Sequence, residues 1–126
     1  MPSGGIVLLA HGSRDAQWRK PIEAVRARIE AERGPLLPVR CAYLELCEPD
    51  LPAAVSELSA LGVRSIAIVP LFLGMGRHAR EDLPRKVQEL ARVLPHVQLR
   101  LQAPIGEDGR LIDLMAQIAS DAAAGE

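Results

Sequence analysis

Short apolar runs alternate along this chain with longer segments in which apolar side chains recur every three or four residues. The apolar runs predict strands, and their unbroken apolar character is typical of parallel strands that are buried on both faces. They cover residues 5–10, 39–46, 65–69 and 97–101. The intervening segments have the period of an amphipathic helix. They cover residues 18–33, 51–61 and 83–94, with a last helix marked by Leu111, Leu114, Met115 and Ile118.

This alternation predicts an α/β fold. Right-handed crossovers between parallel strands place helices on both faces of one sheet. We expect a four-stranded parallel sheet with the flavodoxin-like strand order 2-1-3-4. The sequence has no internal repeat and no linker, so residues 1–126 are expected to form one domain.

Local signals set the expected ends of the helices. Pro21 fits the first turn of a helix over 18–33, since proline lacks the amide hydrogen that later positions need. Asp50 is expected to cap the second helix, and Asp82 to cap the third after a Gly-containing loop of about ten residues. The tail 121–126 is expected to fray.

Composition argues against several classes of partner. The 126 residues carry a formal net charge of −1, so no strong field attracts nucleic acid or an acidic membrane surface. Trp18, Tyr43 and Phe72 are the only aromatic side chains, too few for a base-stacking surface. The sequence has no apolar run long enough to span a membrane and no basic signal segment at its start, which predicts a cytoplasmic protein.

The two cysteines predict neither a disulfide nor a nucleophile. On one strand, Cys41 and Cys47 would lie about 20 Å apart at roughly 3.3 Å per residue, which is too far for a direct bond. They do not form a CxxC pair, and no histidine is near them in the sequence. Reduced thiols are therefore expected.

Two histidines follow predicted strands. His11 comes directly after the first strand, and His78 follows the third strand, past a loop that contains Gly74 and Gly76. Glu45 stands at the carboxyl end of the second strand. The carboxyl ends of neighbouring parallel strands line the ligand crevice of such a sheet, and adjacent strands lie about 4.8 Å apart. Two imidazoles and a carboxylate suit Fe(II), Co(II), Ni(II) or Zn(II), and donors on separate loops leave coordination positions open.

Simpler interpretations stay open at this point. A histidine near a strand end is often a surface residue, and Glu45 could cap a turn or pair with an arginine. His96 precedes the fourth strand on the opposite rim and is interpreted as a surface turn residue. Arg14 and Arg77 flank the histidine segments and could bind ligand carboxylates, with ordinary solvated charge as the alternative. The apolar loop 71–76 could be a wall for a flat ligand or part of a subunit interface.

These motifs together resemble the CbiX/SirB family of class II tetrapyrrole chelatases. They run in order over nearly the whole chain. They are His11-Gly12-Ser13-Arg14, Tyr43-Leu44-Glu45 with Pro49, 69–73 leading to Gly76-Arg77-His78, 81–84, and Ala103-Pro104-Ile105-Gly106. The resemblance implies insertion of a divalent metal ion, which is a substrate, into sirohydrochlorin. Cobalt would belong to cobalamin biosynthesis and iron to sirohaem biosynthesis, the two favoured metals, and nickel to a third cofactor.

The resemblance also implies roles for residues. His11 and His78 would be the catalytic histidines and would bind the metal ion together with Glu45. The chain is similar to the short form of the family, a homodimer, and neither a nucleotide nor an iron–sulfur cluster is expected. Contacts to the tetrapyrrole are expected from Ser13, Arg14, Leu71, Phe72, Gly76 and Arg77.

Two other functions are compatible with the sequence. A tetrapyrrole or metal carrier would use the same residues but would bind stoichiometrically, without turnover. A flavodoxin-like domain for a phosphorylated ligand would show no metal dependence. The second alternative is the weaker one, because the chain has no glycine-rich phosphate motif.

Overall fold

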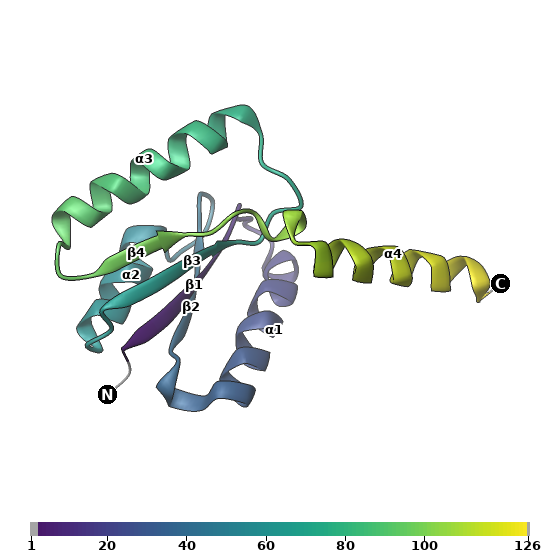
Figure 1. Ribbon diagram of the computed structural model, residues 1–126, viewed down its shortest axis with the longest axis horizontal. Helices are drawn as coiled ribbons and strands as arrows, with labels where there is room; N and C mark the ends of the chain where they lie inside the picture. The colour runs from purple at the N-terminus through teal and green to yellow at the C-terminus, as the bar shows by residue number, and fades with distance from the viewer. Residues whose placement is uncertain (1–2, 126) are drawn as a thin grey trace.

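The computed structural model describes residues 3–125, and within them four strands form one sheet (Figure 1). The strands are β1 (Gly4–Ala10), β2 (Val39–Tyr43), β3 (Ser65–Pro70) and β4 (Gln98–Leu101). Their order is β2-β1-β3-β4, and each neighbouring pair is parallel. At the centre of the sheet, Leu8 lies opposite Cys41 on β2 and Val69 on β3. The predicted fold class and strand order are confirmed.

Helices alternate with these strands in the described part of the chain. They are α1 (Ala16–Arg33), α2 (Leu51–Ala60), α3 (Arg77–Val93) and α4 (Gly109–Ala124), and the short 3-10 turns are η1 (Gly34–Leu36) and η2 (Ile105–Glu107). α1 packs on one face of the sheet, and α2 and α3 pack on the other, whereas α4 projects away from both (Figure 1). Among residues 3–125, no helix has the length and apolar character needed to cross a bilayer.

The core is thickest on the side of α2 and α3. Val7, Leu9, Ile66 and Ile68 point to this side and are 0% exposed, as is Leu58 of α2. Burying an aliphatic side chain of this size stabilises the fold by roughly 1.5–3 kcal/mol relative to leaving it in water. Most of the hydrophobic stabilisation therefore comes from this layer.

The layer beneath α1 is thinner. Leu8, Cys41 and Tyr43 are buried there, and α1 contributes the half-buried Ile22 and Ile29. None of the residues of α1, all of which the structure describes, is itself fully buried. Burial raises the pKa of the Cys41 thiol, so this thiol is protonated near neutral pH and is a poor nucleophile.

β2 ends at Tyr43, three residues before the end that the sequence predicts. The Tyr43 N–H donates to the Pro49 carbonyl at 2.9 Å, so the chain turns back on itself after this point. Leu46 has a φ of 67°, in the left-handed region, which is incompatible with a continuing strand. Glu45 stays close to β1 nonetheless, because its N–H donates to the His11 carbonyl at 3.0 Å.

Capping by aspartate explains two helix starts. The Asp50 cap is confirmed, since its carboxylate accepts a hydrogen bond from the Ala53 N–H at 2.9 Å. α1 begins two residues earlier than predicted, because Asp15 accepts from the Gln17 N–H at 2.9 Å and caps the helix there. Pro21 consequently lies beyond the first turn, and the prediction for it is wrong. The helix loses one backbone hydrogen bond at this proline.

α3 differs most from the prediction. It begins after Gly76, whose carbonyl accepts from the Arg80 N–H at 3.0 Å, and not at Asp82. Asp82 and Pro84 therefore lie inside the helix. The residues before Asp82 are mostly good helix formers. Their backbone hydrogen bonds form although no side chain caps the start of the helix. As a result, His78 sits in the first turn of a helix and not in a loop.

The C-terminal tail is more ordered than predicted. α4 continues to Ala124, and the Gly125 N–H donates to the Asp121 carbonyl at 2.9 Å. Fraying over 121–125 is therefore not observed, and residue 126 lies outside the described residues. Alanines at 122–124 favour this continuation, because alanine has the highest helix propensity.

Tyr43 provides a test of the packing beneath α1. It is the only tyrosine of the chain and is 3% exposed, and burial, aided by repulsion from Cys41 and Glu23, raises its pKa to about 12. We expect ultraviolet titration of the native protein to give a tyrosinate midpoint near 12, against about 10 after denaturation. Since the native pKa is the higher one, stability from burying the neutral phenol is complete below about pH 10 and is lost as the pH rises to 12. A native midpoint near the denatured value would contradict this burial.

Candidate functional site

His11 is the first residue after β1, and its side chain is exposed at the carboxyl-end rim of the sheet. Its imidazole stacks on the ring of Phe72, with centroids 4.3 Å apart and planes inclined by 26°. Phe72 is 3% exposed and belongs to the buried cluster beneath α2 and α3. One face of the imidazole thus rests on a fixed ring. This support lowers the entropy cost of ordering the side chain when it binds a ligand.

Glu45 lies beside His11 because the segments after β1 and β2 are bonded to each other. The bond is the one from the Glu45 N–H to the His11 carbonyl. Gly12 allows this approach, since its φ is 111° and a Cβ at this position would collide with the Glu45 carbonyl oxygen. Glycine alone tolerates both conditions. The Glu45 side chain is exposed on the same rim.

The segment after β4 is tied to this rim as well. The Gly106 N–H donates to the Phe72 carbonyl at 2.9 Å, and a Cβ on Gly106 would collide with the backbone of Leu73. Phe72 is therefore held through its ring by the core and through its carbonyl by the segment after β4. Sequence analysis places Gly106 in a family motif but gives it no structural role. A single sequence does not reveal that a glycine meets another backbone.

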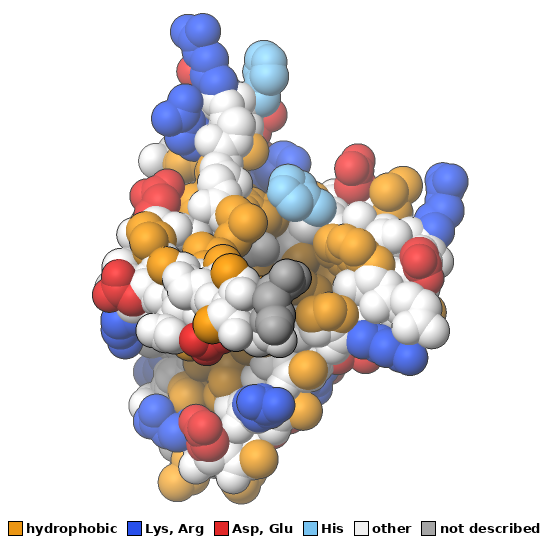
Figure 2. Space-filling model, turned by 90° about the vertical axis from the view of Figure 1, so that its right-hand side faces the viewer, with side chains coloured by type: hydrophobic (Ala, Val, Ile, Leu, Met, Phe, Trp, Pro, Cys, Tyr) orange, Lys and Arg blue, Asp and Glu red, His pale blue; other side chains and the backbone are white. Residues whose placement is uncertain are grey.

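His78 and Arg77 open the first turn of α3, and both side chains are exposed. The Arg77 Nε lies 3.8 Å from a carboxylate oxygen of Glu81, but Arg77 is 84% exposed. An exposed ion pair of this kind contributes little to stability, so Arg77 stays available to a ligand carboxylate. Figure 2 shows histidine side chains on the face toward which α4 projects, with basic side chains near them.

The three predicted metal ligands do not form a ready-made site. Across residues 3–125, no three His, Cys, Asp or Glu side chains come close enough together to hold a metal ion. His11 and Glu45 are neighbours through their backbones, whereas His78 stands beyond the loop that follows β3. An ion at this rim would meet separate donors. A structural zinc site, in contrast, is closed by four ligands.

Several of the predicted contact residues shape the backbone. The Ser13 hydroxyl oxygen accepts from the Asp15 N–H at 3.0 Å and forms the turn into α1. Leu71 packs beneath α1, and Gly76 is the N-cap of α3. The apolar side chain that this loop exposes is Leu73, which is 70% exposed and which sequence analysis does not single out.

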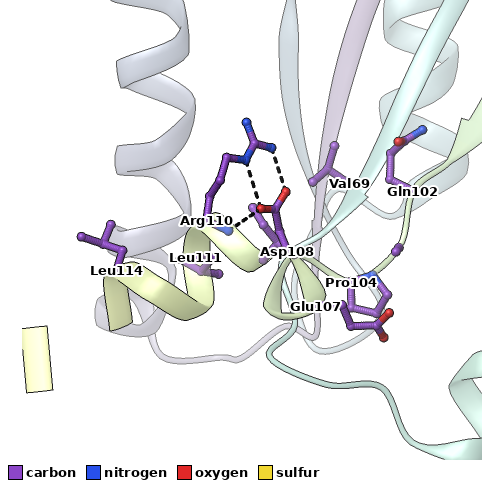
Figure 3. Close-up of a pocket in the computed structure, with 10 residues that line it drawn as sticks. Val69, Gln102, Pro104, Glu107, Asp108, Arg110, Leu111 and Leu114 are labelled. Carbon is purple, nitrogen blue, oxygen red and sulfur yellow. Dashed lines mark hydrogen bonds and ion pairs between the residues drawn. The ribbon is translucent and has the colours of Figure 1, made fainter. Parts of the chain in front are cut away.

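A pocket of about 700 Å³ lies at the base of α4 (Figure 3). Val69 of β3 and Leu111 and Leu114 of α4 supply apolar parts of its lining, and neither His11 nor His78 takes part. Beside them Asp108 and Arg110 form an ion pair at 2.7 Å. Its hydrogen bonds lower the pKa of the Asp108 carboxyl to about 2, so the pair is ionised at any physiological pH.

Comparison with known proteins identifies the family of this chain. The family model described as CbiX matches residues 5–122 of the chain. The sirohydrochlorin cobaltochelatase of Methanopyrus kandleri is 38% identical over 80 residues, which cover 64% of this chain and 55% of that protein. The chain thus spans little more than half the length of this relative.

Two solved structures share the fold. A cobalamin (vitamin B12) biosynthesis CbiX protein from Marinobacter aquaeolei has a TM-score of 0.81 and 35% identity, and the match covers 98% of this chain and 99% of that one. The sirohydrochlorin chelatase SirB from Bacillus subtilis subspecies spizizenii, in complex with cobalt, has a TM-score of 0.76 and 26% identity. That match covers 96% of this chain and 51% of SirB. With the family match over nearly all of its residues, the chain belongs to the CbiX family.

Proposed function

We propose that this chain inserts a divalent metal ion, cobalt or iron, into sirohydrochlorin. The observation that carries the proposal is the position of two exposed histidines, His11 and His78, on segments that follow the neighbouring strands β1 and β3 in a CbiX fold. The name of the Methanopyrus kandleri relative and the cobalt complex of SirB support a divalent ion as one substrate.

Metal insertion exchanges one dication for two protons of the macrocycle. The ion must lose bound water, reach one face of the ring and bond to the pyrrole nitrogens while two N–H protons leave, so that charge balances. A neutral imidazole serves both needs in turn, because it ligates the ion first and accepts a proton once the ion has left. His11 and His78 provide two such groups, one for each proton released.

Glu45 acts as a third donor in this proposal. Its backbone bond to His11 keeps an exposed carboxylate next to the first imidazole. Nitrogen and oxygen donors together suit Co(II) and Fe(II). Because the donors come from separate segments, coordination positions stay open for the macrocycle nitrogens, and the ion can be handed on.

The second substrate is a flat apolar macrocycle edged by carboxylates. Leu73 supplies an exposed apolar contact on the loop between β3 and α3. Arg14, close to His11, and Arg77, next to His78, are exposed cations that can bind carboxylates through paired hydrogen bonds. The other predicted contacts act by shaping and supporting the backbone around the macrocycle. They are Ser13, Leu71, Phe72 and Gly76.

The choice of metal decides the pathway. Cobalt places the reaction in cobalamin biosynthesis, and iron places it in sirohaem biosynthesis. Intrinsic affinity does not select between the two ions, because imidazole and carboxylate bind both. A homodimer, a single domain over residues 1–126 and a cytoplasmic location stay predictions that belong to this proposal.

His11→Ala and His78→Ala, made one at a time, should each slow metal insertion by at least about 100-fold, since general-base catalysis alone contributes 10²–10⁴. The assay follows the absorbance of sirohydrochlorin with Co²⁺ or Fe²⁺ under anaerobic conditions, with the protein at catalytic concentration. Circular dichroism should show an unchanged fold, because both side chains are exposed.

His96→Ala is the matched control for these variants. His96 lies before β4, and a ring nitrogen is 3.1 Å from the Ser59 hydroxyl at the other end of the sheet. Its replacement should leave turnover unchanged. Near-wild-type turnover in both His11→Ala and His78→Ala would sink the assignment. A wild-type spectral change that saturates at one macrocycle per chain, without turnover, would identify a carrier instead.

Arg77→Gln should raise the KM for sirohydrochlorin about five-fold and leave kcat nearly unchanged, because an exposed charged contact is worth up to about 1 kcal/mol. The difference from wild type should shrink as salt is added. Arg64→Gln is the control, since Arg64 is an exposed arginine directly before β3, at the opposite end of the strands. Equal KM values for the two variants would remove Arg77 from the binding site.

A further inference from the structure

Leu46 combines two features that folded chains normally avoid. Its φ of 67° lies in the left-handed region, and among residues 3–125 no other residue except glycines has a positive φ. A residue with a Cβ pays free energy for this conformation, because the Cβ crowds the neighbouring carbonyl oxygen. The side chain is also 50% exposed, and neither core cluster of the described residues contains it. The chain thus holds an apolar side chain in water and in a strained conformation.

The strain of Leu46 comes from a tight turn beside the segment that carries His11. The Cys47 N–H donates to the Glu45 carbonyl at 2.9 Å, which closes a three-residue turn with Leu46 at its centre. This is the rare form of the γ-turn, in which the central residue has a positive φ. Glu45 is itself bonded through its N–H to the His11 carbonyl. Leu46 is therefore fixed at the rim of the sheet, next to His11.

Exposure alone does not distinguish Leu46 from other leucines. Leu36 is 72% exposed before β2, and Leu61 is 44% exposed after α2, both at the opposite end of the sheet. Single exposed apolar side chains of this kind are ordinary. Neither of these two has a positive φ. Strain that glycine or asparagine would relieve is instead typical of functional sites, so Leu46 calls for a role at the rim.

Leu46 has a counterpart on the other side of His11. β1 lies between β2 and β3 in the sheet, so the segments after these strands carry Leu46, His11 and Leu73 in that order. Strands two places apart are separated by about 10 Å, which sets the distance between the two leucine segments. Leu73 is 70% exposed, and its backbone is held by the contact with Gly106. Figure 2 shows hydrophobic side chains beside a histidine on this face.

We propose that Leu46 and Leu73 hold opposite sides of the sirohydrochlorin ring, so that the centre of the macrocycle lies over His11. The inference rests on the proposed function and adds Leu46 to its binding residues. A tetrapyrrole has its four nitrogens at the centre and apolar pyrrole rings around them. Opposite pyrrole rings reach the two leucines, while the nitrogens face the imidazole that delivers the ion. Contact with the ring removes from water the apolar surface that the free protein exposes.

The charges at the rim fit the outer edge of the same ligand. Arg14 follows His11 in the sequence and Arg77 precedes His78, and both arginine side chains are exposed. Carboxylates at the edge of the macrocycle can bond to these guanidinium groups when its apolar rings lie on the leucines. The rim thus offers apolar and cationic contacts together, as an apolar ring edged by carboxylates requires.

Leu46→Asn separates a binding role from a structural one. Asparagine is close to leucine in size and tolerates a positive φ, but it offers no apolar surface. The melting temperature should stay equal or rise by a few degrees. Metal-free sirohydrochlorin should bind about five-fold more weakly, because half of the Leu46 side chain is exposed and can still be buried. Unchanged binding, or weaker binding together with a lower melting temperature, would overturn the proposal.

The dissociation constant is measured by titration of the fluorescence of sirohydrochlorin, without a metal ion and under anaerobic conditions. Leu46→Met keeps an apolar side chain in the same conformation and should bind like wild type. Leu36→Asn makes the polar change at an exposed leucine far from the rim and should also bind like wild type. Equal losses in Leu36→Asn and Leu46→Asn would contradict the assignment. Sedimentation should give one mass for all variants, and a changed mass would assign Leu46 to a subunit contact instead.

A double variant tests the arrangement across the ring. Leu73→Asn should weaken binding about five-fold, and its combination with Leu46→Asn about 25-fold, because contacts this far apart add in free energy. A double variant that binds no more weakly than the single ones would refute the arrangement. Metal insertion is measured separately. Macrocycle binding without turnover in wild type would refute the proposed function alone, whereas unchanged binding in Leu46→Asn with normal turnover would refute this inference alone.

Discussion

Two backbone contacts that leave no room for a Cβ hold the rim of this sheet together. Gly12 lies against the carbonyl of Glu45, and Gly106 lies against the backbone of Leu73. The first contact joins the segments after β1 and β2, and the second joins those after β3 and β4. Parallel strands bring their carboxyl ends to one edge, but they do not fix the loops that follow. These contacts restrain the loops, and the chemistry proposed for the rim depends on that restraint.

Phe72 connects these backbone contacts to the side chain of His11. Its ring lies in the core and stacks on the imidazole of His11, and its carbonyl accepts a hydrogen bond from the Gly106 N–H. His11 is therefore oriented without being enclosed. The other two donors of the proposed function, Glu45 and His78, are exposed on separate segments. A closed set of ligands would retain the ion, whereas oriented but separate donors can release it to a macrocycle that binds it with four nitrogens.

Sequence alone predicted the sheet well because one kind of signal determines it. Unbroken apolar runs mark buried parallel strands, and the handedness of crossovers leaves few orders for them. The start of α3 was not predictable in the same way. Asp82 and Pro84 have the sequence of a helix start, while the true cap, Gly76, offers no side chain to recognise. The error matters for the site, since the observed start of α3 places His78 in the first turn of a helix and the predicted start leaves it in a loop.

Contacts between backbone segments that are far apart in the chain could not be predicted from the sequence, for a different reason. The stacking of His11 on Phe72 and the approach of Gly106 to Leu73 join segments that are far apart in the chain. No local sequence pattern indicates which of these distant segments meet in the folded protein. The candidate donors could be placed after strands from the sequence alone, but the contacts that hold their segments could not be predicted.

The Gly106 contact also links the rim to α4. The hydrogen bond that fixes Phe72 under His11 belongs to the turn that starts α4 and sets its direction. Displacing this turn would therefore disturb both the support of the His11 imidazole and the direction of α4.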